Sequence, residues 1–288
     1  MQKITLFTVT TPSLQQSLCE QLIPGPQRCE QMNSCYLYGE NRYKRSHITP
    51  YAINLVQRRN PWVVTWWSAA FPGLGHMLLG KPVKGLIFLL WEVLANMKSS
   101  LNTAIFYSFT GNFDLAREVA DISWLTIYAV VYIFIIWDSY HLTEKLNKVS
   151  KMAERKRPSL QFMKINSNGH NFLKLSNPRL TAIWSAFMPG LGHLHLQRTI
   201  TGLTILVLWI SIAGLSHMYN AIQLTCTGSC SEALDILNLQ WLLFLPSIFV
   251  FAIYGSYVDA VEINKLYQAE QRSYLAENYQ NPAFDMPV

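Results

Sequence analysis

The feature that most constrains this chain is a stretch of 19 residues that occurs twice. SAAFPGLGHMLLGKPVKGL covers 68–86, and SAFMPGLGHLHLQRTITGL covers 185–203. The same offset of 117 positions places Asn147 on Asn264. A register that stays constant without a gap over about 89 residues predicts that the chain is a duplication.

The apolar runs around the repeat indicate a membrane protein. Only 14% of the 288 residues are charged, against roughly 25% in a soluble domain. Segments 122–137 and 236–257 carry no charge, and each is near the length of about 20 residues that crosses a bilayer. Because basic residues flank these runs, we expect them to contact anionic membrane lipids, and we expect no nucleic acid partner.

Each repeat shows the same order of helices. Asn60 before Pro61 is typical of a helix start, because Asn caps free N–H groups and Pro lacks one. Pro-Gly then ends this short helix. A second apolar stretch is expected over 83–109, then a polar loop, then a third stretch over 121–140, with counterparts in the second repeat. Pro246 should kink its span.

Counting Lys and Arg separates two topologies. If all three apolar stretches of each repeat cross the membrane, the two sides carry 12 and 11 basic residues. If the first stretch enters and returns as a hairpin at Pro-Gly, the split becomes 21 to 2. The positive-inside rule favours the second arrangement, as does the length of 61–71, roughly 16 Å of helix.

We therefore predict an all-α, polytopic integral membrane protein of two parallel repeats. Each repeat has a re-entrant half-hairpin and two transmembrane helices. A pseudo-twofold axis along the membrane normal should bring the two PGLGH elbows together near the centre. The protein is expected in the cell membrane with both termini cytoplasmic. The predicted parts are a cytoplasmic N-terminal segment (1–59), membrane repeat 1 (60–148), a basic cytoplasmic linker (149–176), membrane repeat 2 (177–265) and a cytoplasmic tail (266–288).

The motif W-S-A-x-x-P-G-L-G-H with a following Gly-Leu resembles the TM2-domain-like membrane proteins of bacteria. The resemblance covers about 60–96 and 177–215. It departs from that family after each His, where Met77-Leu78 and Leu194-His195 replace the usual aromatic residues. The resemblance implies a bacterial membrane location and no particular chemistry.

The elbows hold the main candidate site residues. Two interpretations of the histidines stay open: a functional one, as an ion or proton pathway or a metal site with His195, and a structural one, as hydrogen bonds to carbonyls freed by the Pro-Gly break. The glycines are expected to permit close packing and positive φ, with carbonyl coordination of an ion as the alternative. The central elbow residues are Pro72, Gly73, Gly75, His76, Pro189, Gly190, Gly192 and His193.

Four further groups of residues carry hypotheses of their own. Glu92 is an acid inside an apolar span, either functional or held by a hydrogen-bond partner. Cys226 and Cys230 either form a small disulfide loop outside the cell or stay free thiols. Asp138 is expected to be a solvated cap. We expect no bound metal, with the N-terminal cysteines (Cys19, Cys29 and Cys35) as reduced thiols rather than a zinc site with His47.

Catalytic and cofactor motifs are missing from the sequence. We therefore expect no enzyme and no cofactor. The chain is predicted to be a non-catalytic assembly or regulatory platform, partnered by other membrane proteins or by itself. The alternative is a channel or transporter for a small solute or ion, with the two PGLGH hairpins lining the pathway.

Overall fold

A computed structural model describes residues 46–49, 52–156, 163–166 and 169–279 of the chain. The first half contains the helices α3 (Pro61–Ala70), α4 (Leu74–Leu78), α5 (Pro82–Ser99), α6 (Leu101–Phe109), α7 (Phe113–Val119) and α8 (Ile122–Lys156). The second half contains α9 (Pro178–Phe187), α10 (Leu191–His195), α11 (Thr199–Leu215), α12 (Met218–Cys226), α13 (Cys230–Ile236), α14 (Leu239–Leu242) and α15 (Leu245–Tyr279). Both final helices therefore extend beyond the predicted membrane repeats, α8 into the linker and α15 into the tail.

The described residues are predominantly helical, as the all-α prediction expects, and a short β-hairpin that it did not include precedes each half. β1 (Ser46–Thr49) pairs antiparallel with β2 (Ala52–Leu55), and β3 (Met163–Asn166) pairs antiparallel with β4 (Gly169–Phe172). The two hairpins are 117 positions apart, so the matching register begins upstream of Asn60. Strands of four residues place only two side chains on each face, which is too short an alternation to recognise in a sequence.

Among the described residues, two helices are long and apolar enough to cross a membrane. They are Ile122–Ala153 within α8 and Leu239–Ala276, which joins α14 and α15. The pair α11 and α12 is bent by 60° and makes a third candidate if it is counted as one span. The break before α15 falls at Leu243–Phe244, so Pro246 lies in the first turn of a new helix rather than inside one.

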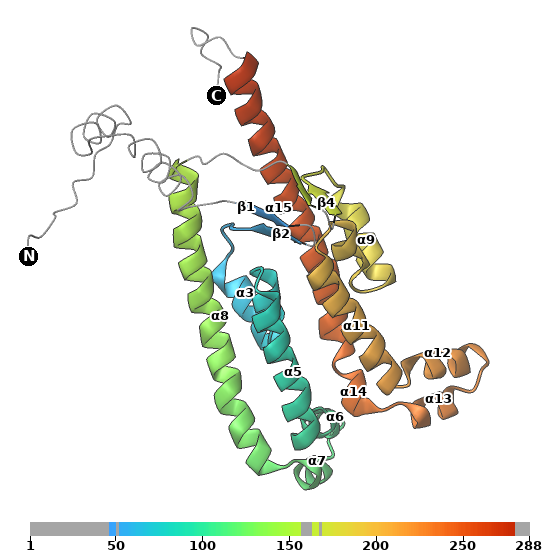
Figure 1. Ribbon diagram of the computed structural model, residues 1–288. Coiled ribbons are helices and arrows are strands. Elements are labelled where there is room, and N and C mark those ends of the chain that lie inside the picture. Colours follow the sequence, from blue (N-terminus) through green and yellow to red (C-terminus); the bar gives the residue numbers. More distant parts are fainter. Residues whose placement is uncertain (1–45, 50–51, 157–162, 167–168, 280–288) are drawn as a thin grey trace, which may run out of the picture. The chain divides into compact units, whose positions relative to one another are not determined.

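The second apolar stretch of each half is broken, contrary to the prediction of continuous helices. Ser100 separates α5 from α6 with φ +52°, and His217 separates α11 from α12 with φ +57°. The carbonyls freed there are bonded: Ser99 accepts from the Asp121 amide at 3.2 Å. The expected polar loops are the helical hairpins α6–α7 and α12–α13 (Figure 1). The sequence gives no signal for these breaks, because Ser and His, the residues found at positions 100 and 217, also occur inside helices.

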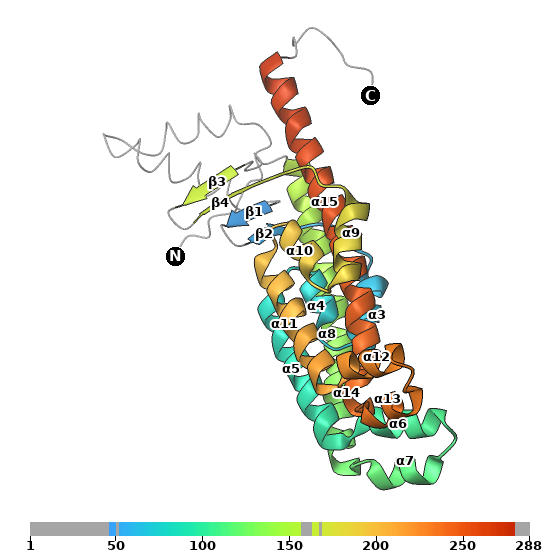
Figure 2. The same cartoon turned by 90° about the vertical axis from the view of Figure 1, so that its right-hand side faces the viewer.

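The final helix of each half packs against the elbow helix of the same half, α8 against α3 and α15 against α9 (Figures 1 and 2). The main core gathers side chains from α3, α4 and α5 with others from α11 and α15. The elbow of the first half thus lies between the halves, whereas α9 keeps large apolar side chains exposed. This one-sided packing differs from the expected meeting of two elbows on a central axis.

Candidate functional site

The elbow backbone is built in the same way in both halves. Asn60 caps α3 by accepting from the Trp62 amide at 3.0 Å, and Asn177 caps α9 by accepting from the Arg179 amide at 3.0 Å. After Pro72, Gly73 has φ +101°, and Gly190 has φ +104°. This left-handed conformation, which favours glycine, starts α4 and α10 directly after the break.

The other elbow glycines lie where the chain approaches itself closely. A Cβ on Gly75 would overlap the Ser68 hydroxyl and the Val64 carbonyl oxygen, and a Cβ on Gly192 would overlap the equivalent Ser185 and Thr181. The elbow backbone is therefore packed against its own first helix. The carbonyls of these glycines accept from backbone amides of the chain: Gly75 from Leu79 at 3.1 Å, and Gly192 from Leu196 at 3.2 Å.

His76 is fully buried and bonded to a carboxylate. Its Nε2 lies 2.7 Å from Oδ2 of Asp138 on α8. The same oxygen accepts from Lys84 Nζ at 2.6 Å. The hydrogen-bonding partner of His76 is thus a side-chain acid rather than the freed carbonyl that the structural interpretation named. Asp138 is correspondingly not a simple solvated cap, because it joins α4, α5 and α8.

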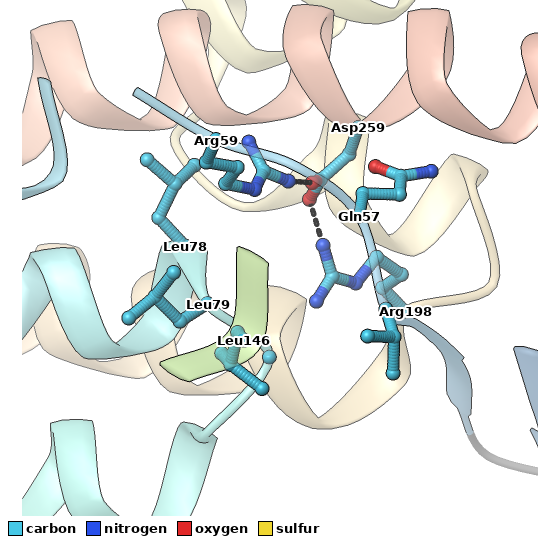
Figure 3. A pocket seen from close by; sticks show the side chains of 9 residues that line it. Gln57, Arg59, Leu78, Leu79, Leu146, Arg198 and Asp259 are labelled. Carbon is cyan, nitrogen blue, oxygen red and sulfur yellow. Dashed lines mark hydrogen bonds and ion pairs between the residues drawn. The ribbon is translucent and has the colours of Figure 1, made fainter. Parts of the chain in front are cut away.

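His193 lies beside a different carboxylate, Asp259 of α15. Its Nε2 is 3.8 Å from Asp259 Oδ2, an ion-pair distance rather than a hydrogen bond. Arg198 Nη1 donates to that same oxygen, and Arg59 Nη2 donates to Oδ1 at 3.0 Å. Figure 3 shows both guanidinium groups directed at Asp259. Because Arg59 precedes the first elbow and Asp259 ends the second half, this carboxylate ties the two halves together.

The sequence comparison missed this acid for a specific reason. Asp138 is equivalent to Gly255 in the 117-residue register, so no acid recurs at that position. Asp259 is four residues further on, one helical turn along the same face. A Cβ on Gly255 would lie 3.1 Å from His193 Nε2, so glycine there leaves room for the ring. Allowing a shift of one turn in the comparison would have found the acid.

Small cavities surround the segment that leads into α3. One of about 20 Å³ touches Arg59, Arg198 and Asp259 and has room for about one water. Two others, of about 200 Å³ and 170 Å³, lie between this segment and α15, beside Glu262. They are found at the ends of the elbows rather than at the Pro-Gly breaks.

Glu92 is buried on α5 and begins a polar network. Asn96 Nδ2 is 3.5 Å from Glu92 Oε1 and 3.0 Å from Asn102 Oδ1. Gln240 of α14 donates to Asn96 Oδ1 at 2.6 Å and accepts from the Thr103 amide at 2.9 Å. The network bridges the break after α5 to the second half. Glu92 joins it through one long contact, and its Oε2 is buried without a hydrogen-bond partner.

Asn147 and Asn264 each clamp the backbone before an elbow. Asn147 accepts from the Arg59 amide at 2.9 Å and donates to the Arg59 carbonyl at 2.8 Å. Asn264 makes the same pair with Ser176, at 2.9 Å and 2.7 Å. The repeated Asn at positions 147 and 264 thus marks a contact that fixes the backbone just before the first helix of each elbow.

Cys226 and Cys230 have free, exposed thiols, so the disulfide alternative is not found in this structure. Cys226 ends α12 and Cys230 begins α13. Within the described ranges, no group of three or more His, Cys, Asp or Glu is placed to hold a metal ion. The hypothesis on Cys19, Cys29 and Cys35 lies outside the described residues.

Comparisons with protein-family models, with curated proteins and with solved structures give no match to this chain. The candidate spans and the helical architecture indicate the class, a predominantly helical membrane protein. The likeness to TM2-domain-like proteins therefore rests on the sequence motif alone.

Proposed function

We propose that this chain is a duplicated integral membrane protein with four spans and two re-entrant elbows. The left-handed backbone positions support duplication, because they fall in pairs 117 apart: Gly73 and Gly190, Gly80 and Gln197, Ser100 and His217, Gly111 and Gly228. In this layout α5 and α11 are the first and third spanning segments. Their 18 and 17 residues give roughly 26 Å of helix, close to the hydrocarbon thickness.

The proposed membrane orientation places both termini, the linker and the elbow exits on the cytoplasmic face. The basic residues support it, with 21 of 23 on that side. The helical hairpins α6–α7 and α12–α13 then lie at the outer interface, where exposed apolar side chains such as Phe109 and Phe113 meet the lipid boundary.

Native cysteines test this orientation without engineered reporters. A membrane-impermeant maleimide added to intact cells should label the chain at Cys226 and Cys230, because both thiols are exposed. The variant Cys226→Ser/Cys230→Ser should lose that labelling and keep labelling after permeabilisation. A cysteine introduced at Lys81 must stay unlabelled from outside; labelling there would refute the re-entrant hairpin.

The function that we propose is a non-catalytic membrane platform, on which other proteins or further copies assemble. One observation carries this proposal: the carboxylates beside the two elbow histidines are paired within the chain itself. Asp138 is bonded to His76 and Lys84, and Asp259 to Arg59 and Arg198. Carboxylates that serve a solute would be left for the solute to pair with.

Flux through proteoliposomes distinguishes the platform from a channel or transporter. We expect the purified protein to conduct K⁺, Na⁺ and protons no faster than empty liposomes. A selective permeation that disappears in His76→Ala/His193→Ala would overturn the proposal. Asp121→Asn, changed at the opposite end of α8, is the matched control and should leave any such flux unaltered.

A further inference from the structure

The contact between the two halves uses one face of each. Trp67 of α3 packs edge-on against Phe251 of α15 at 5.2 Å between ring centroids, and against Tyr254 at 5.2 Å. Phe71 packs against Phe244 at 5.5 Å. Trp67 is only 7% exposed and Phe251 only 1%. An aromatic elbow face thus fits a stripe on the final helix of the other half.

Residues equivalent to these two contacting faces occur a second time in the chain, on α9 and α8, where they are exposed. Trp184 of α9 is the equivalent of Trp67 and is 45% exposed, and Phe134 of α8 is the equivalent of Phe251 and is 49% exposed. Other residues of α8 at positions equivalent to the occupied stripe are also exposed, namely Ile127, Val130 and Trp137.

The stripe on α8 has the geometry of the stripe already used on α15. Its members Ile127, Val130, Phe134 and Trp137 are spaced by three, four and three residues, which places them on one helix face. The occupied stripe of Phe244, Ser247, Phe251 and Tyr254 has the same spacing. Each molecule therefore carries an exposed aromatic face on α9 and an exposed stripe on α8 that match the faces which α3 and α15 bring together.

We propose that a second copy of this chain occupies these faces, with α9 of one molecule packed against α8 of the next. This head-to-tail contact repeats between molecules the contact that α3 and α15 make within one. Such heterologous contacts build a closed ring or an open row, depending on the rotation between copies. This inference rests on the proposed platform function and extends it by naming the partner, which is a second copy of the chain.

Apolar exposure alone would not support this assembly, because membrane helices normally expose apolar side chains to lipid. Val207 of α11 is exposed in the same way and has no counterpart in the interface between the halves. The distinguishing observation is that the exposed positions on α8 and α9 are those which the chain uses to join its own halves.

Cysteine cross-linking between two tagged copies tests the proposal. The five native cysteines are first changed to Ser. Copies carrying Trp184→Cys and copies carrying Phe134→Cys are then co-expressed and treated in native membranes with a short bismaleimide. We expect a cross-linked dimer that contains both tags. Trp67→Cys/Phe251→Cys in one chain is the positive control, because that pair should react within the molecule.

Matched pairs decide between head-to-tail contact and its competitors. Val207→Cys with Phe134→Cys should give no dimer. A dimer from Trp184→Cys with itself, and none from the mixed pair, would show a twofold contact and overturn the proposal. Reaction of the intramolecular control without any mixed dimer would show that lipid covers both faces, and would overturn it too. Neither result depends on the flux measurement. The cross-linking experiment therefore tests the head-to-tail contact, and the flux measurement tests the platform function.

Discussion

Removing the charge of Asp259 should destabilise the protein more than any other single isosteric change at the elbows. The Asp259 carboxylate is 4% exposed and neutralises both Arg59 and Arg198. In Asp259→Asn, two largely buried guanidinium groups lose their counter-charge. Breaking a buried ion pair by removing one partner costs about 3–5 kcal/mol, so we expect a loss of this size in the free energy of unfolding.

Asp138→Asn is the matched control in the other half. Its carboxylate is 19% exposed, and its partner Lys84 is 41% exposed. The amide oxygen of Asp138→Asn can still accept from buried His76 Nε2, so the loss is mainly that of the exposed Lys84 pair, about 0–1 kcal/mol, much less than for Asp259→Asn. Arg198→Gln gives an intermediate case, because Asp259 keeps Arg59; we expect the loss of one charge-assisted bond, about 1.5–3 kcal/mol.

Titration with SDS in mixed micelles measures these differences. The nine tryptophans report unfolding by fluorescence, and all variants are compared at one lipid-to-detergent ratio. Added salt should weaken the Lys84–Asp138 pair and leave the Asp259 cluster nearly unaffected, because burial limits screening. Equal losses for Asp259→Asn and Asp138→Asn would refute the reasoning, since burial would then not govern the cost.

Four further substitutions test the packing of the elbows and of the helix breaks. Gly73→Ala should abolish the folded peak in size-exclusion chromatography, because its Cβ would overlap the Gly85 carbonyl oxygen; Gly111→Ala, with φ +81° and open space, should cost only about 1–2 kcal/mol. Asn264→Ala should lower stability by about 1–3 kcal/mol and speed proteolysis before α9, because Ser176 loses both backbone bonds. Gln240→Ala should raise hydrogen exchange at the Thr103 amide, which loses its acceptor; unchanged exchange there would contradict the proposed bridge.

Local signals in the sequence were enough to predict the first helix of each elbow. Asn60 and Pro61 determine the start of α3, and Pro72 with Gly73 determines its end, because capping and backbone strain act within a few residues. The two α-helical spans that the structure identifies also follow from composition, since length and hydropathy are properties of one segment.

The breaks at Ser100 and His217 could not be predicted in this way. Both residues have positive φ, which is uncommon for residues other than glycine. Hydrogen bonds from residues further along the chain stabilise both breaks. The Asp121 amide donates to the Ser99 carbonyl, and the Asn238 amide donates to the Ser216 carbonyl at 3.1 Å. The Asp259 cluster was missed for a similar reason, because Arg59 and Asp259 are 200 positions apart and no periodicity links them.

The ion pairs of the two halves differ by a coordinated shift. In the first half the cation is Lys84, whereas in the second half it is Arg198, which is equivalent to Lys81. The cation thus moves about one turn toward the start of its helix, while the acid moves one turn toward the end of its own. Since α5 and α8 run in opposite directions (Figure 1), both moves go toward the same end of the molecule. The pair is displaced as a unit, which brings Asp259 within reach of Arg59 and changes a contact within one half into a contact between halves.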